Sequence, residues 1–249
     1  MPSFELYILD IDGTLIRGAE PIPGAPQAVA RLRAKGAKLA FVTNNSSLTR
    51  GQLKFKLNRL GFHLQANEVE TSATAAAAYL ADQRITRVLA IGEPGLRKTL
   101  QAAGIESAKT GVNAQAVVAG ICRTLTYRKI DAALQQIRAG ARFIATNTDA
   151  TYPIENGRVE PGAGATVGAI QAATGLQPVV IGKPSPTLIQ RVLEKTGTKP
   201  KDALVVGDRL ETDISAGKAA GCPTCLVLTG VTAKAPPGQF TLASVADLV

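Results

Sequence analysis

The sequence predicts an α/β protein whose main unit is a Rossmann-like parallel sheet covered by helices. Short apolar runs rich in β-branched residues alternate with polar or glycine turns and with helical patterns along the chain, and this succession is typical of parallel sheets. Polar clusters also stand directly after several of the apolar runs. Because open parallel sheets carry their sites at the carboxyl ends of the strands, both observations favour the same fold.

The predicted strands are short apolar runs that end in polar or glycine residues. They cover residues 4–9, 38–42, 87–91, 116–119, 142–145, 178–181, 203–206 and 224–228. The predicted helices cover residues 25–34, 50–60, 73–81, 96–103, 129–138, 164–174, 186–196 and 212–220. Gly197 and Gly221 directly follow the last two helices, in the position where a helix end favours glycine.

The length and composition are those of an ordinary globular enzyme. The 249 residues suffice for one large domain or for a core domain with a smaller one inserted, and 45% of them are hydrophobic and 19% charged. No apolar run approaches the roughly 20 residues that span a bilayer. Residues 1–5 lack the basic and long apolar segments of a secretory signal. We therefore expect a cytoplasmic protein with no membrane partner.

The formal net charge of +9 predicts attraction of anions. Aromatic residues make up only 4% of the chain, tryptophan is absent, and the basic residues are scattered. The stacking surfaces and dense basic runs of many nucleic-acid binders are therefore missing. We expect no nucleic acid as partner. We interpret the charge as a solvated basic surface, which would also help to recruit a small phosphorylated metabolite.

The three cysteines, Cys122, Cys222 and Cys225, suit a reducing compartment better than a disulfide framework. Cys222 and Cys225 have the spacing of redox and metal sites. No second Cys/His pair could complete a zinc site, however, and the pair leads into an apolar run. We therefore favour burial at the start of a strand over redox chemistry.

Four polar clusters at strand ends fit together chemically. They are residues 10–14 after strand 4–9, 43–46 after strand 38–42, 182–184 after strand 178–181, and 207–208 after strand 203–206. In the first cluster, Asp10 and Asp12 are one residue apart, and Gly13 permits a sharp bend that aims both carboxylates at one point. Such a pair alone also occurs in turns and helix caps, so the joint occurrence of the four clusters carries the prediction.

The other clusters supply what a carboxylate needs in order to attack phosphorus. Repulsion between the two anions must be neutralised by cations. Asp208 and Asp213 offer oxygens to Mg²⁺, and Lys183 offers a compact positive charge. The hydroxyl of Thr43 and the backbone N–H groups after it suit the non-bridging oxygens of a phosphate. The sequence therefore predicts phosphoryl transfer, in which one of the two aspartates of the first cluster attacks phosphorus while the other moves protons.

With these residues the sequence resembles the haloacid dehalogenase-like superfamily, whose phosphatases carry a DxDGT motif, a Thr or Ser, a Lys and an acidic motif in this order. The longer runs 42–47, 182–186 and 207–214 resemble its NagD-like and para-nitrophenylphosphatase branch. The resemblance implies hydrolysis of phosphate monoesters through an aspartyl phosphate. It also implies a phosphatase rather than a dehalogenase, because the dehalogenases of the superfamily lack the equivalent of Asp12.

The resemblance also assigns roles to individual residues. Asp10 is the nucleophile, and Asp12 protonates the leaving oxygen and then activates water. Thr43, Asn44 and Lys183 hold the phosphate. Mg²⁺ binds the Asp10 carboxylate, the Asp12 backbone carbonyl and the Asp208 carboxylate. The supporting residues are Asp213, Gly13 and Asn45.

The spacing of the motifs predicts where a second α/β domain is inserted. Only about 30 residues separate Asp12 from Thr43, whereas about 140 separate Thr43 from Lys183, which is room for a domain. This matches the branch's larger α/β cap. We expect a first core part at residues 1–71, a cap at 72–177 and a second core part at 178–249, with boundary errors of a few residues. The cap should exclude water and contact the leaving group.

One segment of the predicted cap imitates the cluster around Thr43. Residues 143–149 also run from an apolar strand into Thr-Asn and end at Asp149. We interpret Asp149 as a pocket residue or a turn former, the turn former being the commoner case. His63, the only histidine, is predicted to lie in an exposed loop.

Two other functions stay open at this point. The same residues would serve a phosphotransferase or mutase acting on sugar phosphates. A phosphate-binding regulator without turnover is disfavoured because the set Asp10, Asp12, Lys183 and Asp208 is intact. Phosphoglycolate, nucleoside monophosphates, sugar phosphates and pyridoxal phosphate all suit the chemistry. A homodimer formed through the cap follows only by analogy.

Overall fold

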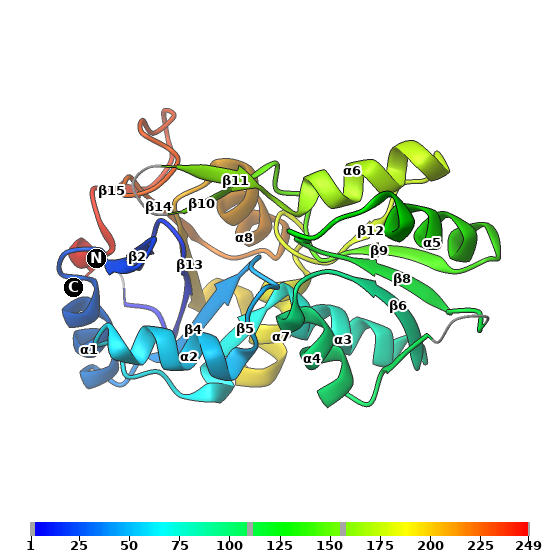
Figure 1. The fold of residues 1–249 in the computed structure, drawn as a ribbon. Coiled ribbons are helices and arrows are strands. Elements are labelled where there is room, and N and C mark those ends of the chain that lie inside the picture. Colours follow the sequence, from blue (N-terminus) through cyan, green and yellow to red (C-terminus); the bar gives the residue numbers. More distant parts are fainter. Residues whose placement is uncertain (1–2, 109–111, 155–157, 249) are drawn as a thin grey trace.

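The structure is a computed structural model that describes residues 3–108, 112–154 and 158–248. Two parallel sheets lie side by side (Figure 1), and together they confirm the predicted α/β class. The first sheet has the strand order β15-β14-β13-β1-β4-β5 and the second has the order β12-β9-β8-β6-β7. Two antiparallel hairpins, β2-β3 and β10-β11, complete the strands of the described residues.

All neighbouring strands in the first sheet are parallel. Its strands are β1 (Leu6–Asp10), β4 (Lys38–Thr43), β5 (Val69–Thr71), β13 (Ala203–Gly207), β14 (Thr224–Val227) and β15 (Thr241–Leu242). The second sheet consists of β6 (Arg87–Ile91), β7 (Glu106–Ser107), β8 (Ala116–Ala119), β9 (Arg142–Ala145) and β12 (Val179–Val180). The hairpin strands are β2 (Ile16–Arg17), β3 (Glu20–Pro21), β10 (Thr151–Pro153) and β11 (Val159–Pro161).

The helices connect the strands and cover both faces of each sheet. They are α1 (Ala25–Ala34), α2 (Arg50–Arg59), α3 (Ser72–Asp82), α4 (Pro94–Ala102), α5 (Tyr127–Arg138), α6 (Ala163–Thr174), α7 (Thr187–Thr196) and α8 (Ser215–Ala219). Short 3₁₀ turns lie at Ala66–Glu68, Pro200–Asp202 and Val245–Leu248. A π-helical turn, Leu210–Ile214, stands where the sequence predicts the first part of a helix.

The alternation of side chains along each strand explains how the helices pack. In the first sheet, Leu9 and Phe41 face α1 and α2, whereas Ile8 and Val42 face α7. In the second sheet, one face packs against α5 and α6 and the other against α3 and α4 (Figure 1). Each sheet is therefore buried on both faces, which is why its strands read as nearly continuous apolar runs.

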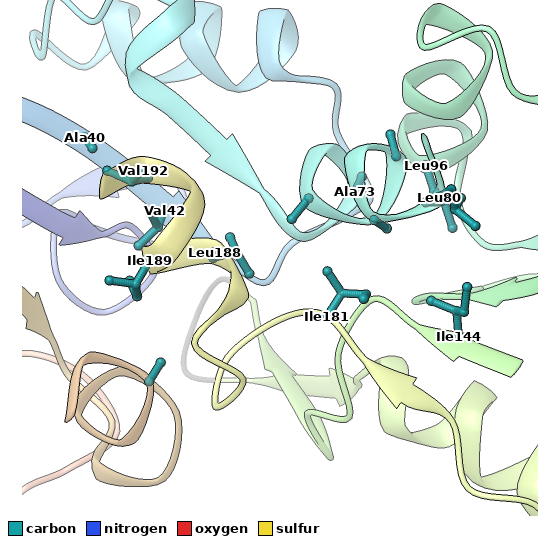
Figure 2. Packing of buried hydrophobic residues seen from close by; sticks show 14 of the residues in the cluster. Ala40, Val42, Ala73, Leu80, Leu96, Ile144, Ile181, Leu188, Ile189 and Val192 are labelled. Carbon is teal, nitrogen blue, oxygen red and sulfur yellow. The ribbon is translucent and has the colours of Figure 1, made fainter. Parts of the chain in front are cut away.

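One apolar cluster joins the two sheets. Figure 2 shows Ala73 and Leu80 of α3 together with Val42 of the first sheet and Ile144 of the second. Ile181, at 1% exposure, belongs to the same cluster. Apolar burial contributes about 25 cal/mol per Å². The shared cluster therefore stabilises the position of the second sheet beside the first.

Several features of the fold differ from the prediction. The segment predicted as core strand 178–181 forms β12, which pairs with β9 and therefore belongs to the second sheet. β12 lies within the few residues of error given for the predicted boundary between residues 177 and 178, and the domain limits stay a prediction. β5 is not predicted, because its three residues include Glu70 and carry no apolar run.

Candidate active site

The first acidic residue of the site ends a buried strand. Asp10 is the last residue of β1 and is 6% exposed. The chain then bends, with Asp12 forming a bridge to Ile16 and Gly13 at a φ of +94°. A Cβ at Gly13 would lie 2.5 Å from Oδ2 of Asp208. Glycine is therefore needed at this position both for its conformation and for the close approach of Asp208.

Lys183 lies between two carboxylates in the interior. Its Nζ is 2.5 Å from Oδ1 of Asp10 and 2.5 Å from Oδ1 of Asp213, and its side chain is 3% exposed. Burial by itself lowers the pKa of Lys183, but the attraction of the two carboxylates outweighs it and raises the pKa above the ordinary lysine value. The lysine therefore stays positively charged in the site.

Three buried carboxylates converge on one point. Oxygen atoms of Asp10, Asp208 and Asp213 all lie within 4.8 Å of one another. Burial, followed by repulsion from Asp213, raises the pKa of Asp208 to about 6 and places the pKa of Asp10 well above its ordinary value. One lysine cannot balance three carboxylates, so the cluster has the charge and the hard oxygen donors of a divalent cation site.

The hydroxyl of Thr43 connects the second motif to Asp12. Thr43 ends β4, and its Oγ1 donates to Oδ2 of Asp12 at 3.4 Å and accepts from the backbone N–H of Asn45 at 3.0 Å. Burial raises the pKa of the Asp12 carboxyl above its ordinary value. A carboxyl that holds a proton more readily suits a group that both gives and takes one.

The side chains of Asn44 and Asn45 both bind residues of the inserted unit, and Asn44 also binds the backbone of Lys183. Asn44 Nδ2 donates to the backbone oxygen of Lys183 at 2.9 Å and to Asp149 at 3.1 and 3.2 Å. Asn45 Nδ2 donates to the hydroxyl of Tyr152 at 2.8 Å. The phosphate contact of Asn44 stays a prediction, and its side-chain N–H groups are already engaged by protein atoms.

A pocket between the two sheets brings these residues together. The predicted residues that line it are Asp10, Asp12, Thr43, Asn44, Asn45, Lys183, Asp208 and Asp213. The inserted unit contributes Ile121, Asn147, Asp149, Thr151, Tyr152, Gly162 and Ala163. Arg209 and Thr212 line it from the turn that carries Asp213. The core residues that line the pocket are thus mainly acidic, whereas those of the inserted unit are partly polar and partly apolar.

Comparison with known proteins gives the family. A family model described as haloacid dehalogenase-like hydrolase matches residues 7–106, and a second, described as HAD-hydrolase-like, matches residues 180–248. The 5'-nucleotidase YutF of Bacillus subtilis is 40% identical over 233 residues, which are 93% of this chain and 90% of the relative. The chain belongs to the haloacid dehalogenase-like hydrolases.

Solved structures of this hydrolase family superpose closely on the chain. The p-nitrophenyl phosphatase from Archaeoglobus fulgidus has a TM-score of 0.92 at 35% identity, covering 99% of this chain and 98% of its own. The glycerol phosphate phosphatase Rv1692 from Mycobacterium tuberculosis, solved in complex with magnesium, has a TM-score of 0.89 at 36% identity, covering 98% and 75%. The predicted branch and the predicted enzyme class, a phosphatase, are confirmed.

Several residues that line the pocket or contact Asp208 escape the sequence motifs of this hydrolase. Gly230 approaches Asp208 so closely that no Cβ fits between them, and the N–H of Val231 donates to Asp208 Oδ2 at 2.6 Å. Neither residue stands next to a motif. The sequence gives one signal for Asn147, because this residue lies in the segment 143–149, which resembles the strand and Thr-Asn pattern around Thr43.

The cysteines and the histidine lie away from the chemistry. Cys222 and Cys225 are buried, and burial raises their pKa values to about 11 and about 12. Thiols with such pKa values are poor nucleophiles at neutral pH, which supports the burial interpretation. His63 is exposed, as predicted. Among the described residues, no helix combines the length and the apolar character needed to cross a membrane.

Proposed function

We propose that this hydrolase is a Mg²⁺-dependent phosphatase that hydrolyses small phosphate monoesters through an aspartyl phosphate on Asp10. The observation that carries the proposal is the position of Asp10. Its carboxylate lies 2.5 Å from Lys183 Nζ, within 4.8 Å of two further carboxylates, and on the wall of the pocket that Thr43 also lines. Few other chemistries require a buried carboxylate, a buried cation and a divalent-cation site at one point.

The first half of the reaction uses Asp10 and Asp12. A carboxylate oxygen of Asp10 attacks phosphorus and forms an acyl phosphate, while the bond from phosphorus to the leaving oxygen breaks. Asp12 gives its proton to that leaving oxygen, and its raised pKa favours the protonated form that this step needs. Lys183 and the hydroxyl of Thr43 bind the non-bridging oxygens as their charge redistributes.

The second half returns both aspartates to their starting state. Asp12, now a carboxylate, takes a proton from a water molecule that attacks phosphorus. The bond between phosphorus and Asp10 breaks, and inorganic phosphate leaves. Thr43 Oγ1 also lies 3.4 Å from Oδ2 of Asp12. Because a hydroxyl has a single proton to donate, it holds this carboxylate only while it does not donate to a phosphate oxygen.

The donor set fits Mg²⁺. The cluster offers hard carboxylate oxygens, and its negative charge exceeds the single positive charge of the lysine. The backbones of Gly13 and Gly230 both lie so close to the Asp208 carboxylate that a Cβ at either position would clash with it. We expect Asp10, Asp208 and the backbone carbonyl of Asp12 to hold the ion, with Asp213 supporting them from beside Lys183. When bound, the ion neutralises negative charge on carboxylate and phosphate.

Asp10→Asn tests the nucleophile. With Mg²⁺ and para-nitrophenyl phosphate, we expect kcat/KM to fall about a thousandfold or more. Asp131→Asn, an exposed aspartate on α5, is the matched control and should keep wild-type activity. Near-normal turnover by a folded Asp10→Asn protein would refute the assignment. Equal release of free phosphate and alcohol indicates hydrolysis, whereas phosphate retained in an organic product indicates transfer.

The partner and the compartment follow from the same reasoning. A small phosphorylated metabolite suits the pocket, since the acidic core residues with Mg²⁺ would hold its phosphate and the inserted unit would contact the rest. The three free and buried cysteines support a reducing compartment such as the cytoplasm. A screen of phosphoglycolate, nucleoside monophosphates, sugar phosphates and pyridoxal phosphate would identify the metabolite.

A further inference from the structure

The amide group of Asn44 is engaged by protein atoms at both of its ends. One N–H donates to the backbone oxygen of Lys183 at 2.9 Å, and the other is shared by the two oxygens of Asp149 at 3.1 and 3.2 Å. Oδ1 accepts from the backbone N–H of Lys183 at 2.8 Å. Since a carboxamide has only two N–H donors, this side chain has none left for a phosphate.

The contacts of Asn44 fix the backbone from which the catalytic lysine extends. Asn44 binds both the N–H and the C=O of Lys183, and the two residues are 9% and 3% exposed. Gly182 permits this pairing, because a Cβ there would lie 2.5 Å from Asn44 Oδ1. The position of Lys183 Nζ between Asp10 and Asp213 therefore depends on how the Asn44 amide is held.

Asp149 reaches Asn44 from the inserted unit. It lies in the loop after β9, where its backbone N–H donates to Oδ1 of Asn147 at 3.1 Å. Nδ2 of Asn147 in turn donates to the backbone oxygen of Asn44 at 2.7 Å. Asn44 thus joins the loops after β4 and β9 twice, once through its side chain and once through its backbone.

The chemistry of Asp149 determines which way the amide faces. An ionised carboxylate only accepts hydrogen bonds, so it attracts the NH₂ group of Asn44 and repels Oδ1. A flipped amide would place its oxygen against Asp149 and its NH₂ group against the N–H of Lys183. Hydrogen bonds to a charged acceptor are also about twice as strong as neutral ones. Asp149 thus favours the one orientation that binds both backbone groups of Lys183.

We propose that Asp149 is a positioning residue for phosphoryl transfer, which acts through the Asn44 amide on Lys183. The inference rests on the proposed function, because it concerns the lysine of that reaction. It places the second Thr-Asn segment, residues 143–149, in the catalytic apparatus as its support. The inserted unit then has two tasks: it covers the pocket, and it holds a core residue in its working orientation.

A direct contact between Asp149 and the substrate is the competing explanation, since Asp149 also lines the pocket. The two explanations differ in what a substitution changes. A substrate contact affects KM, and its effect varies with the leaving group. A positioning residue affects kcat, and it does so equally for all leaving groups because every substrate uses the same lysine.

The experiment compares Asp149→Ala, Asp149→Asn, Asn44→Ala and the double variant Asn44→Ala/Asp149→Ala on para-nitrophenyl phosphate and glycerol phosphate. We expect Asp149→Ala to lower kcat about 10- to 100-fold on both substrates, the range found for groups that orient a catalytic residue, with KM within about threefold. Asp149→Asn should recover most of the loss, because its carbonyl oxygen still accepts from Asn44. The double variant should be no slower than Asn44→Ala alone.

Three results would overturn the proposal: losses that multiply in the double variant, a loss confined to KM, or a loss that differs tenfold between the two substrates. Asp131→Ala, which removes an exposed aspartate of the inserted unit, controls for a general effect of charge. Thermal unfolding of each variant separates misfolding from mispositioning. If the alanine variant unfolds, Asp149→Leu, which keeps the shape of the side chain but has no hydrogen-bond acceptor, takes its place and should show the same loss of kcat. If the wild-type protein had no phosphatase activity, the proposed function itself would be refuted. The three results above concern the variants alone, so the two kinds of failure can be distinguished.

Discussion

Lys183 Nζ lies 2.5 Å from Oδ1 of Asp213, and this contact joins the third and fourth motifs inside the protein. Asp213 also accepts the backbone N–H of Arg209 at 3.0 Å through Oδ2. The π-helical turn Leu210–Ile214 brings Asp213 close to Gly207, where no Cβ would fit. Asp213 therefore holds the lysine in place and also fixes the start of the turn that follows Asp208.

Asp213→Asn tests this role. The amide removes one of the two charges beside Lys183 Nζ, so the lysine should be held less firmly against Asp10, and we expect kcat to fall about 10- to 100-fold. Glu211→Gln changes an exposed carboxylate on the same turn and should leave kcat unchanged. Steady-state kinetics with para-nitrophenyl phosphate measures both, and equal activity of the two variants would count against the role of Asp213.

Removal of divalent cations should destabilise the protein. Binding to the folded state alone adds about 2.7 kcal/mol at a ligand concentration of 100 Kd, and the acidic cluster is formed only in the folded chain. We therefore expect Tm to rise with Mg²⁺ concentration and to return to its starting value with EDTA. Asp208→Asn should abolish most of this rise. A variant that responds to Mg²⁺ as the wild type does would place the ion elsewhere.

The position of the site could be predicted from the sequence because parallel strands end at one edge. Asp10, Thr43 and Asp208 each follow an apolar run directly, and the structure brings all three to the same pocket. Lys183 lines the same pocket, although the strand before it joins the other sheet. A strand of two residues carries too little pattern to reveal its partner, so only tertiary packing decides where it pairs.

The support of the site could not be predicted in the same way. The Asn44 amide binds Asp149 and Lys183, which are 105 and 139 residues away along the chain. Nothing in the local pattern of Thr43 and Asn44 distinguishes such a contact from a bond to phosphate. Gly230 likewise gains its importance only from its close approach to Asp208. Such roles depend on contacts between residues that are far apart in the sequence, and a local sequence motif contains no information on these contacts.

Arg84→Gly should stabilise the protein. Arg84 is an exposed residue just after α3, with a φ of +56° that side chains rarely adopt. Since the left-handed conformation costs a non-glycine residue about 1 kcal/mol, we expect a gain of roughly 0.5 to 1 kcal/mol in the free energy of unfolding.

Gly36→Ala is the matched opposite of Arg84→Gly. Gly36 follows α1 at a φ of +80°, and a Cβ there would meet no atom within 4 Å. Its replacement should therefore cost about 1 kcal/mol through the backbone conformation alone. Urea denaturation of both variants measures the two changes. Shifts of the same sign would show that the conformation at these helix ends does not govern stability.

The ion pairs of Glu70 should make the free energy of unfolding depend on pH in the acid range. The side chain is 2% exposed in the edge strand β5, and its carboxylate binds Arg50, Arg191 and Lys195. Burial alone raises the pKa of Glu70, but its bonds to Lys195 and the neighbouring groups outweigh this and lower the pKa below 4.5. The unfolded chain thus takes up the proton first as pH falls, and the contribution of Glu70, complete above pH 4.5, is lost as pH drops through the folded pKa.

Glu70→Gln should therefore lower the free energy of unfolding at pH 7 by about 1 to 3 kcal/mol, since three cations lose a buried partner. The cations are themselves 21% to 40% exposed, which keeps the loss below that of a fully buried ion pair. The difference from the wild type should shrink as pH falls below 4.5, because the unfolded wild-type chain then takes up a proton that the folded chain, with its lowered Glu70 pKa, binds less readily. Urea denaturation at pH 7 and pH 3.5 measures both values, and a difference that stays constant would contradict the ionic role of Glu70.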